Sequence, residues 1–361
     1  VSGSEIISSN SKTSYNGNYG LNASWTIYNG SKRLKTLKQE RLNNQIAELD
    51  VATSENTIKE SIAQIYIQIL YAAESVRVNE NTLQVSIAQR DRGQELLNAG
   101  SIAKSDLAQL EAQVSTDRYQ LVTAQATLQD YKLQLKQLLE LDGENEMNVY
   151  LPKLSDENVL APLPAKKDVY VSALAIRPEI EASKLNVEAS ELGIDIAKSS
   201  YFPTISLSAG IGTNHTSGSD FTFGEQVKNG WNNSFGLSVS VPIFNNRQTK
   251  SAVQKAKLQR ETNMLSLLDE QKALYKTIES LWLDANSAQQ RYAAANEKLR
   301  STQISYDLIS EQFNLGMKNT VELLTEKNNL LQAQQEQLQA KYMAILNTQL
   351  LKFYQGDKLT L

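Results

Sequence analysis

The feature that most constrains this chain is an internal repeat at an offset of 216 residues. Residues 19–29 align with 235–245, and residues 97–100 align with 313–316, without an insertion or a deletion. Self-similarity at a fixed offset indicates that one supersecondary unit is used twice. We interpret each copy as a strand, a long helix, a turn and a second helix.

Each copy begins with a segment in which apolar residues alternate with small or polar ones. These segments are 19–27 and 235–243, and a further alternating segment covers 205–213. The pattern predicts strands with one apolar face, as in transmembrane β-barrels, although a half-buried strand of a soluble sandwich alternates in the same way. Aromatic residues near the strand ends favour the barrel, because they resemble the girdles found at membrane interfaces. These aromatic residues are Trp25, Tyr201, Phe202, Trp231 and Phe244.

Long helices are predicted where apolar residues recur at alternating spacings of four and three. The pattern from 274 to 313 is broken only by Thr302, and the pattern from 107 to 138 only by Asp117. Sustained heptads of this kind predict helices that coil around partners. The stretches 31–97 and 247–313 contain no proline, so each is predicted to be one helix of roughly 100 Å at 1.5 Å per residue. The predicted heptad positions of the first long helix are Ile58, Ile62, Ile65, Ile69 and Val76.

Turns and a linker divide the helices. Gly100 and Gly316 end the heptads, and helices are predicted to resume over 104–140 and 320–354. Each copy is therefore a helical hairpin. Residues 141–177 contain three prolines and are predicted to form a linker, and a helix restarts at Pro178, since proline suits the first helical turn.

The second copy carries a helix and a strand, 178–213, that have no counterpart in the first. We therefore expect an N-terminal helix and first strand to be missing from the chain. The stretch 214–233, between two predicted strands, is rich in Gly, Asn, Ser and Thr and is predicted to be a loop.

Composition argues against several functional classes. The 36 basic and 40 acidic residues are interspersed, so there is no basic face for nucleic acid. The chain has no cysteine, which excludes a disulfide scaffold and thiolate metal sites. Its one histidine, His215, lies in the predicted loop. No acidic or hydroxyl residue stands at a spacing from it that is typical of a catalytic site, so a solvated loop residue is favoured over a catalyst. No G-x-x-x-x-G-K-[ST] loop is present. We predict no enzyme activity, no cofactor and no metal site.

Four segments, in order along the chain, together resemble the TolC family of outer-membrane factors. They are Arg177-Pro178-Glu179-Ile180, Tyr201-Phe202-Pro203-Thr204-Ile205, Val241-Pro242-Ile243-Phe244 and the turn from Leu315 to Leu324. The resemblance covers nearly the whole chain. It implies a mainly α fold with a β-barrel part. Long coiled-coil hairpins would form an α-barrel, and each protomer would give four strands to a trimeric 12-stranded transmembrane β-barrel.

The resemblance also implies a division of the chain into regions. Residues 1–30 and 202–246 would form the barrel strands and extracellular loops, 31–140 the first hairpin of the periplasmic tunnel, 141–176 an equatorial linker, and 177–201 with 247–355 the second set of tunnel helices.

The implied function is a passive exit duct of a tripartite efflux system. The protein would be a homotrimer in the outer membrane of a Gram-negative bacterium, contacting outer-membrane lipid and extending into the periplasm. A periplasmic adaptor (membrane fusion) protein and an inner-membrane pump of the RND, ABC or MFS type would be its partners. We favour export of small molecules or drugs. Two alternatives stay open: a duct for type I protein secretion, and a structural coiled-coil stalk of a cell surface or phage.

Family members close the duct at the periplasmic helix tips and carry acidic rings near the constriction. The resemblance places Glu322, six residues after Gly316, in such a ring, and Asp106 at the equivalent place in the first copy. Thr325 stands where the family pattern has a second acid, which puts a double ring in doubt. The alternative for both acids is a favourable interaction with the helix dipole. The predicted tip residues for gating and adaptor contact are Gly100, Gly316, Lys318, Asn319 and Thr320, with a solvated turn as the alternative.

Overall fold

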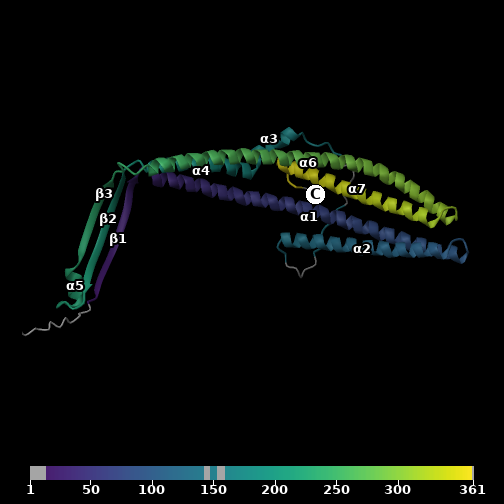
Figure 1. Ribbon diagram of the computed structural model, residues 1–361, viewed down its shortest axis with the longest axis horizontal. Helices are drawn as coiled ribbons and strands as arrows, with labels where there is room; N and C mark the ends of the chain where they lie inside the picture. The colour runs from purple at the N-terminus through teal and green to yellow at the C-terminus, as the bar shows by residue number, and fades with distance from the viewer. Residues whose placement is uncertain (1–13, 142–146, 153–158, 360–361) are drawn as a thin grey trace, which may run out of the picture. The chain divides into compact units, whose positions relative to one another are not determined.

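The computed structural model describes residues 14–141, 147–152 and 159–359 (Figure 1). Residues 1–13 of the region predicted to form barrel strands and loops, and residues 142–146 and 153–158 of the predicted linker, lie outside these ranges. The chain forms two compact units, one from 1–46 and 184–266 and the other from 47–183 and 267–361. Each unit is described by itself below.

The first unit contains a three-stranded antiparallel sheet with the order β1-β2-β3 (Figure 1). Its strands are β1 (Asn16–Asn29), β2 (Thr204–Thr216) and β3 (Asn232–Ser240). The register places Trp25, Leu207 and Leu237 in one row across the sheet, and Ser24, Ser208 and Gly236 in the adjacent row. Because successive side chains point to opposite faces, the sheet has one apolar and one polar face, as the alternation predicts.

Two sequence predictions for this unit need correction. Strand β3 ends at Ser240, before the last alternating residue, Ile243, because Pro242 has no N–H to donate to a ladder. The predicted loop 214–233 contains a short helix, α5 (Phe223–Asn229). The Thr222 Oγ1 accepts the Glu225 N–H at 3.4 Å, and the Glu225 carboxylate accepts the Thr222 N–H at 2.9 Å. This capping box is readable as T-x-x-E in the sequence.

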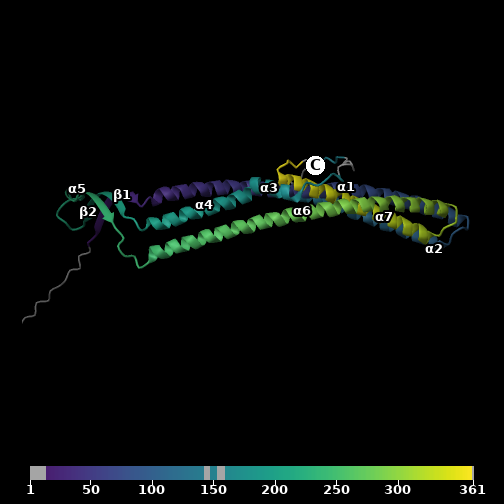
Figure 2. The same cartoon turned by 90° about the horizontal axis from the view of Figure 1, so that it is seen from above.

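Three helices contribute to the rest of the first unit: α1 (Lys32–Asn98), α4 (Pro178–Ser199) and α6 (Gln248–Asn314). Helix α4 lies alongside α1 and α6 in both views (Figures 1 and 2). Gln39 on α1 donates to the carbonyl of Ala189 on α4 at 2.8 Å. Arg260 on α6 pairs with Glu191 on α4 at 2.8 Å.

The second unit contains the hairpin of α1 and α2 (Lys104–Leu138), the hairpin of α6 and α7 (Thr320–Gln355), and α3 (Lys166–Ile176). The four hairpin helices confirm the predicted ranges to within two residues at every end. The residues of α6 that were predicted to occupy heptad positions include most of its buried residues. Leu274, Ile278, Ala285, Ala288 and Tyr292 are all nearly inaccessible to solvent.

The predicted heptad residues of α1 are mostly not the residues that are buried within this chain. Of the five predicted residues only Ile69 is buried, and Ile58 is 46% exposed. The buried residues of the same stretch include Ala63, Ile67 and Leu70, which pack against α7. Helix α1 carries apolar residues on more than one face, so periodicity alone could not identify the face that the chain itself covers.

Helix α3 was not predicted, because the prolines around it indicated only a linker. Val169 and Ala173 on α3 are fully buried against Leu274 of α6 and Leu351 of α7. Lys166, at the start of α3, pairs with Glu279 of α6 at 2.9 Å. The linker is thus packed along the second hairpin over its described helical part.

Candidate gate at the helix tips

The turns at Gly100 and Gly316 have the same backbone geometry. Both glycines have positive φ, 75° and 73°, a region that a side chain disfavours. The Ser101 N–H donates to the Leu96 carbonyl and the Met317 N–H to the Gln312 carbonyl, both at 2.8 Å. The two glycine N–H groups each donate to the carbonyl three residues earlier at 2.9 Å. These paired bonds define a Schellman motif, so both copies of the repeat end their long helices in the same way.

The two predicted gate acids each stand in the first turn of the helix that follows. The Glu322 carboxylate accepts the Asn319 N–H at 3.2 Å, while the Asn319 side-chain oxygen accepts the Glu322 N–H at 2.9 Å. Asp106 accepts the Ala103 N–H at 3.0 Å, but alanine has no side-chain acceptor to complete the reciprocal bond. Each acid therefore caps its helix, and a position in the lumen of a duct stays a prediction for both.

The other predicted tip residues differ in accessibility. Lys318 is half-buried and pairs with Glu322 at 2.6 Å, and this hydrogen bond, aided by the Asn319 N–H, holds the pKa of Glu322 below its usual value. Asn319 is exposed. Thr320 is only 2% exposed, so direct contact with an adaptor would require this turn to open. A Cβ at Gly100 or Gly316 would meet open space.

Behind the turns, the two hairpins pack on a shared apolar cluster. Its buried members come from all four helices and are Leu96, Leu110, Phe313 and Leu323. Gly93 on α1 leaves room for the Leu110 side chain of α2, because a Cβ at this position would lie 2.4 Å from Leu110 Cδ1. Arg92 on the first hairpin also donates to the carbonyl of Asn314 on the second at 3.3 Å. The tips of the two hairpins are therefore directly joined within the chain.

A buried polar cluster lies next to these tips, and the sequence did not predict it as a site. It consists of Ser86 on α1, Asp117 on α2 and Lys327 on α7, none more than 3% exposed. Lys327 Nζ donates to Asp117 Oδ2 and to Ser86 Oγ, and Ser86 Oγ donates to the same carboxylate oxygen. Burial lowers the pKa of the Lys327 ammonium, and the hydrogen bond with Asp117 opposes this shift. The break in the α2 heptad at Asp117 was the sequence signal.

A second charge cluster, in which Arg177 is buried and its two carboxylate partners are half-buried, joins α1, the start of α4 and the end of α7. Arg177 pairs with Glu60 and with Glu179, both at 2.9 Å. Its guanidinium carbon lies 3.9 Å from the ring centroid of Tyr354. Burial, followed by the nearby Glu60 carboxylate, raises the pKa of Tyr354 to about 12. The resemblance motif that begins at Arg177 thus has a structural role in the second unit.

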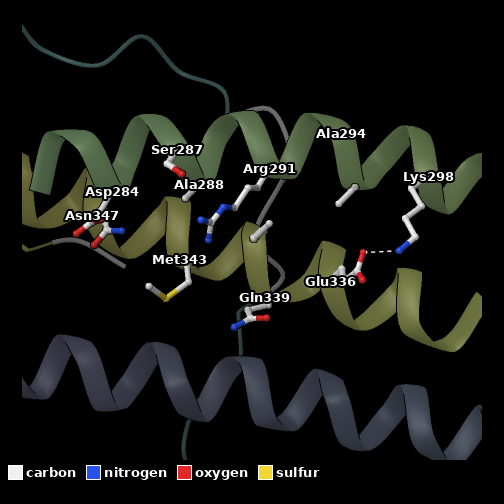
Figure 3. Close-up of a pocket in the computed structure, with 12 residues that line it drawn as sticks. Asp284, Ser287, Ala288, Arg291, Ala294, Lys298, Glu336, Gln339, Met343 and Asn347 are labelled. Carbon is white, nitrogen blue, oxygen red and sulfur yellow. Dashed lines mark hydrogen bonds and ion pairs between the residues drawn. The ribbon is translucent and has the colours of Figure 1, made fainter. Parts of the chain in front are cut away.

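A groove of about 550 Å³ lies between α6 and α7 (Figure 3). Its floor includes the small residues Ala288 and Ala295, and Lys298 pairs with Glu336 across it at 2.7 Å. Arg291 extends into the groove (Figure 3), and within the described part of the chain it has no ion-pair partner.

The predicted interface aromatics all lie in the first unit and are well exposed. Trp25, Tyr201, Phe202, Trp231 and Phe244 each expose half or more of their surface. The apolar face of the sheet is equally open, with Phe235 at 85% and Leu237 at 66% exposure. Contiguous exposed apolar surface of this kind marks contact with a membrane or with another chain.

None of the helices formed by the described residues has both the length and the apolarity that a membrane-crossing helix needs. No group of three or more metal-ligating side chains is gathered among them.

Comparison with known proteins gives consistent matches. The family model described as "Outer membrane efflux protein" matches residues 2–140 and 169–356. The outer membrane efflux protein BepC of Brucella suis is 25% identical over 294 residues, which cover 81% of this chain and 61% of BepC. The outer membrane protein TolC of Escherichia coli is 25% identical over 341 residues, covering 91% of this chain and 66% of TolC. The chain thus spans somewhat less than two thirds of the length of these two relatives.

Among solved structures, a crystal structure of CusC superposes with a TM-score of 0.81 at 20% sequence identity. The match covers 98% of this chain and 81% of the CusC chain. At this identity the likeness shows a shared fold.

Proposed function

Because the chain belongs to the outer membrane efflux protein family, we propose that the whole protein is the exit duct of a tripartite efflux system. It is a passive conduit in the outer membrane of a Gram-negative bacterium and extends into the periplasm. The family is one of efflux ducts and not of enzymes. The relatives BepC and TolC are both named as outer-membrane proteins, which supports the location.

The observation that carries this proposal is the sheet of the first unit. Its apolar face is open, and its other face carries Gly, Ser and Asn residues. Within the described residues, the outer edges of β1 and β3 pair with no strand. An open edge leaves backbone N–H and C=O groups without partners, which is costly in lipid. Pairing with further strands would satisfy both edges, and closure of the sheet with strands of other copies would enclose a polar lumen.

We take the number of copies to be three, as the family resemblance implies. The helices offer surfaces for this assembly, because Ile58 on α1 and Leu258 and Leu265 on α6 remain exposed in the single chain. Burying such stripes against identical helices is the usual outcome for heptad-patterned rods.

Fractionation and mass measurement test the proposal. The full-length protein should sediment with the outer membrane, require detergent for extraction, and give a mass of three chains after subtraction of bound detergent. A soluble monomer would contradict the proposal and favour the structural stalk.

The partners proposed for the duct are a periplasmic adaptor and an inner-membrane pump of the RND, ABC or MFS type. The tips are the proposed place of adaptor contact, with Lys318 and Asn319 as the accessible side chains. Charge reversal of Lys318 should weaken cross-linking to the adaptor in cells, whereas charge reversal of Lys272, an exposed lysine of α6, should not.

We propose small molecules as the cargo, since the matching family and BepC are both named for efflux. Deletion of the gene should sensitise cells to detergents, dyes or antibiotics. Unchanged sensitivity together with loss of a secreted protein would indicate type I secretion instead.

A further inference from the structure

The buried cluster of Ser86, Asp117 and Lys327 joins both hairpins at one point. Asp117 lies on α2 and Ser86 on α1, so the first hairpin supplies two members, and Lys327 on α7 supplies the third. The second oxygen of Asp117 accepts the amide of Gln113 at 2.8 Å. Both carboxylate oxygens are therefore satisfied without water, as a buried charge requires.

The position of the cluster relative to the tips is informative. Asp117 follows Asp106 by 11 residues on α2, and Lys327 follows Glu322 by five residues on α7. Between the cluster and the turns lies the apolar cluster of Leu110 and Leu323. A movement of α7 along α2 at Lys327 would therefore be transmitted over about one and a half helical turns to Glu322 and about three turns to Asp106.

Stability alone does not account for this cluster. A buried ion pair often contributes no more to stability than apolar residues of similar volume would, because two charges must be removed from water. Its best-attested role is to specify one register, as a polar core residue does in a coiled coil. Leucine and alanine contacts tolerate small sliding movements, whereas sliding at this site would leave two buried charges unpaired.

We propose that Asp117 and Lys327 are positioning residues of the gate. They fix the register of α7 against α2 and so set the relative places of Glu322 and Asp106 at the tips. This inference rests on the proposed function, because it assumes that the tips form the gate of a duct.

Three variants separate positioning from simple stabilisation. Asp117→Leu alone leaves a buried ammonium and should lower the thermal midpoint. Asp117→Leu with Lys327→Met removes both charges and should restore the midpoint. The exchange Asp117→Lys with Lys327→Asp restores an ion pair in the opposite sense. The matched control, Lys298→Met with Glu336→Leu, removes a pair that also joins two helices but is 44% and 42% exposed.

The first readout is amide hydrogen exchange of the tip segments 97–107 and 313–323 in the detergent-solubilised full-length protein. In the apolar double variant these amides should exchange roughly tenfold faster than in the wild type, within the range of coupling between contacting residues, although the midpoint is restored. The exchanged pair should regain most of the protection, and the control should match the wild type. Wild-type tip protection in the apolar double variant would overturn the inference, even if the exchanged pair fails to fold.

The second readout is single-channel recording in planar bilayers, where the apolar double variant should spend more time open. A wild type that forms no ion-conducting pore would refute the proposed function. The hydrogen-exchange result would still decide whether Asp117 and Lys327 hold the tips in register.

Discussion

Gly93→Ala tests whether the Leu110 side chain packs against the Gly93 backbone as tightly as the structure indicates. Two effects oppose one another. Alanine favours a helix interior over glycine by about 1 kcal/mol. The new methyl group would also meet Leu110 Cδ1 at 2.4 Å, and overpacking of a closed core typically costs about 1–3 kcal/mol. Leu110 is 1% exposed and has little room to move away.

The expected net result is destabilisation by up to about 2 kcal/mol. Gly193→Ala supplies the matched control, because Gly193 also lies inside a helix but its added Cβ would contact only Gln39 Nε2 at 3.5 Å. That variant should be stabilised by about 0.5–1 kcal/mol. Since both variants gain the same helix preference, the difference between them isolates the steric cost at Gly93.

Thermal unfolding of the detergent-solubilised protein, followed by circular dichroism, measures both shifts. Gly93→Ala should melt below the wild type and Gly193→Ala above it. Adding Leu110→Ala should cost less in the Gly93→Ala background than in the wild type, because the new methyl group occupies part of the vacated space. Equal stabilisation by the two glycine substitutions would refute the tight packing of Leu110 against Gly93.

Three further predictions concern charged and titrating groups. Glu322→Ala should lower the cation-over-anion selectivity of the pore severalfold, with Glu326→Ala as the comparison. Because the pKa of Glu322 is lowered, wild-type selectivity should persist in mild acid and fall only below the pH range in which an ordinary glutamate titrates. Loss of selectivity above that range would contradict this. Arg177→Met should destabilise the protein by about 3 kcal/mol in chemical unfolding, since it removes the cation that pairs with two half-buried carboxylates. Arg260→Met, at an exposed ion pair, should cost less than about 1 kcal/mol. Equal effects of the two substitutions would contradict the argument from burial. Tyr354 has a raised pKa of about 12, so its neutral form stabilises the fold below pH 10 and this contribution is lost as the pH rises toward 12. Tyr354→Phe should therefore flatten the decline of the melting temperature over that alkaline range, and an unchanged slope would refute the assignment.

The helices and strands were predictable because their signals are local. Heptads without proline specify the long helices, and the glycines at 100 and 316 mark the ends where positive φ is needed. The alternation of apolar and polar residues identified both sheet faces. These signals depend on backbone conformation and neighbouring residues, and the tertiary structure did not override them.

The features that the sequence did not predict share one physical cause, because each depends on tertiary packing. Helix α3 is specified largely by the buried surface that Val169 and Ala173 find on α6 and α7, and two residues make a weak periodic signal. The buried stripe of α1 depends on which neighbour covers it. For the polar cluster, Asp117 was visible as a break in the heptad, but its partner Lys327 is 210 residues away. Only the tertiary structure identifies that pairing.

The repeat also shows that the buried charge pair is not duplicated. The equivalent positions in the other copy hold residues that cannot form it. At the offset of 216 residues, Asp117 corresponds to Ala333, which is fully buried, and Lys327 corresponds to the exposed Glu111. The counterpart of Ser86 is Thr302, whose hydroxyl donates to carbonyls of its own helix.

In the proposed ring each hairpin would have one neighbour inside its own chain and one in the next copy. Asp117 and Lys327 fix the register of the inner contact, whereas their counterparts in the repeat, Ala333 and Glu111, cannot form such a pair between copies. If the tips open and close, we therefore expect the movement to occur mainly between copies. Cross-links between copies at the tips should block opening, and cross-links between the two hairpins of one chain should leave it intact. Opening that is blocked equally by both would mean that the hairpins move independently and that the pair of Asp117 and Lys327 does not hold them together.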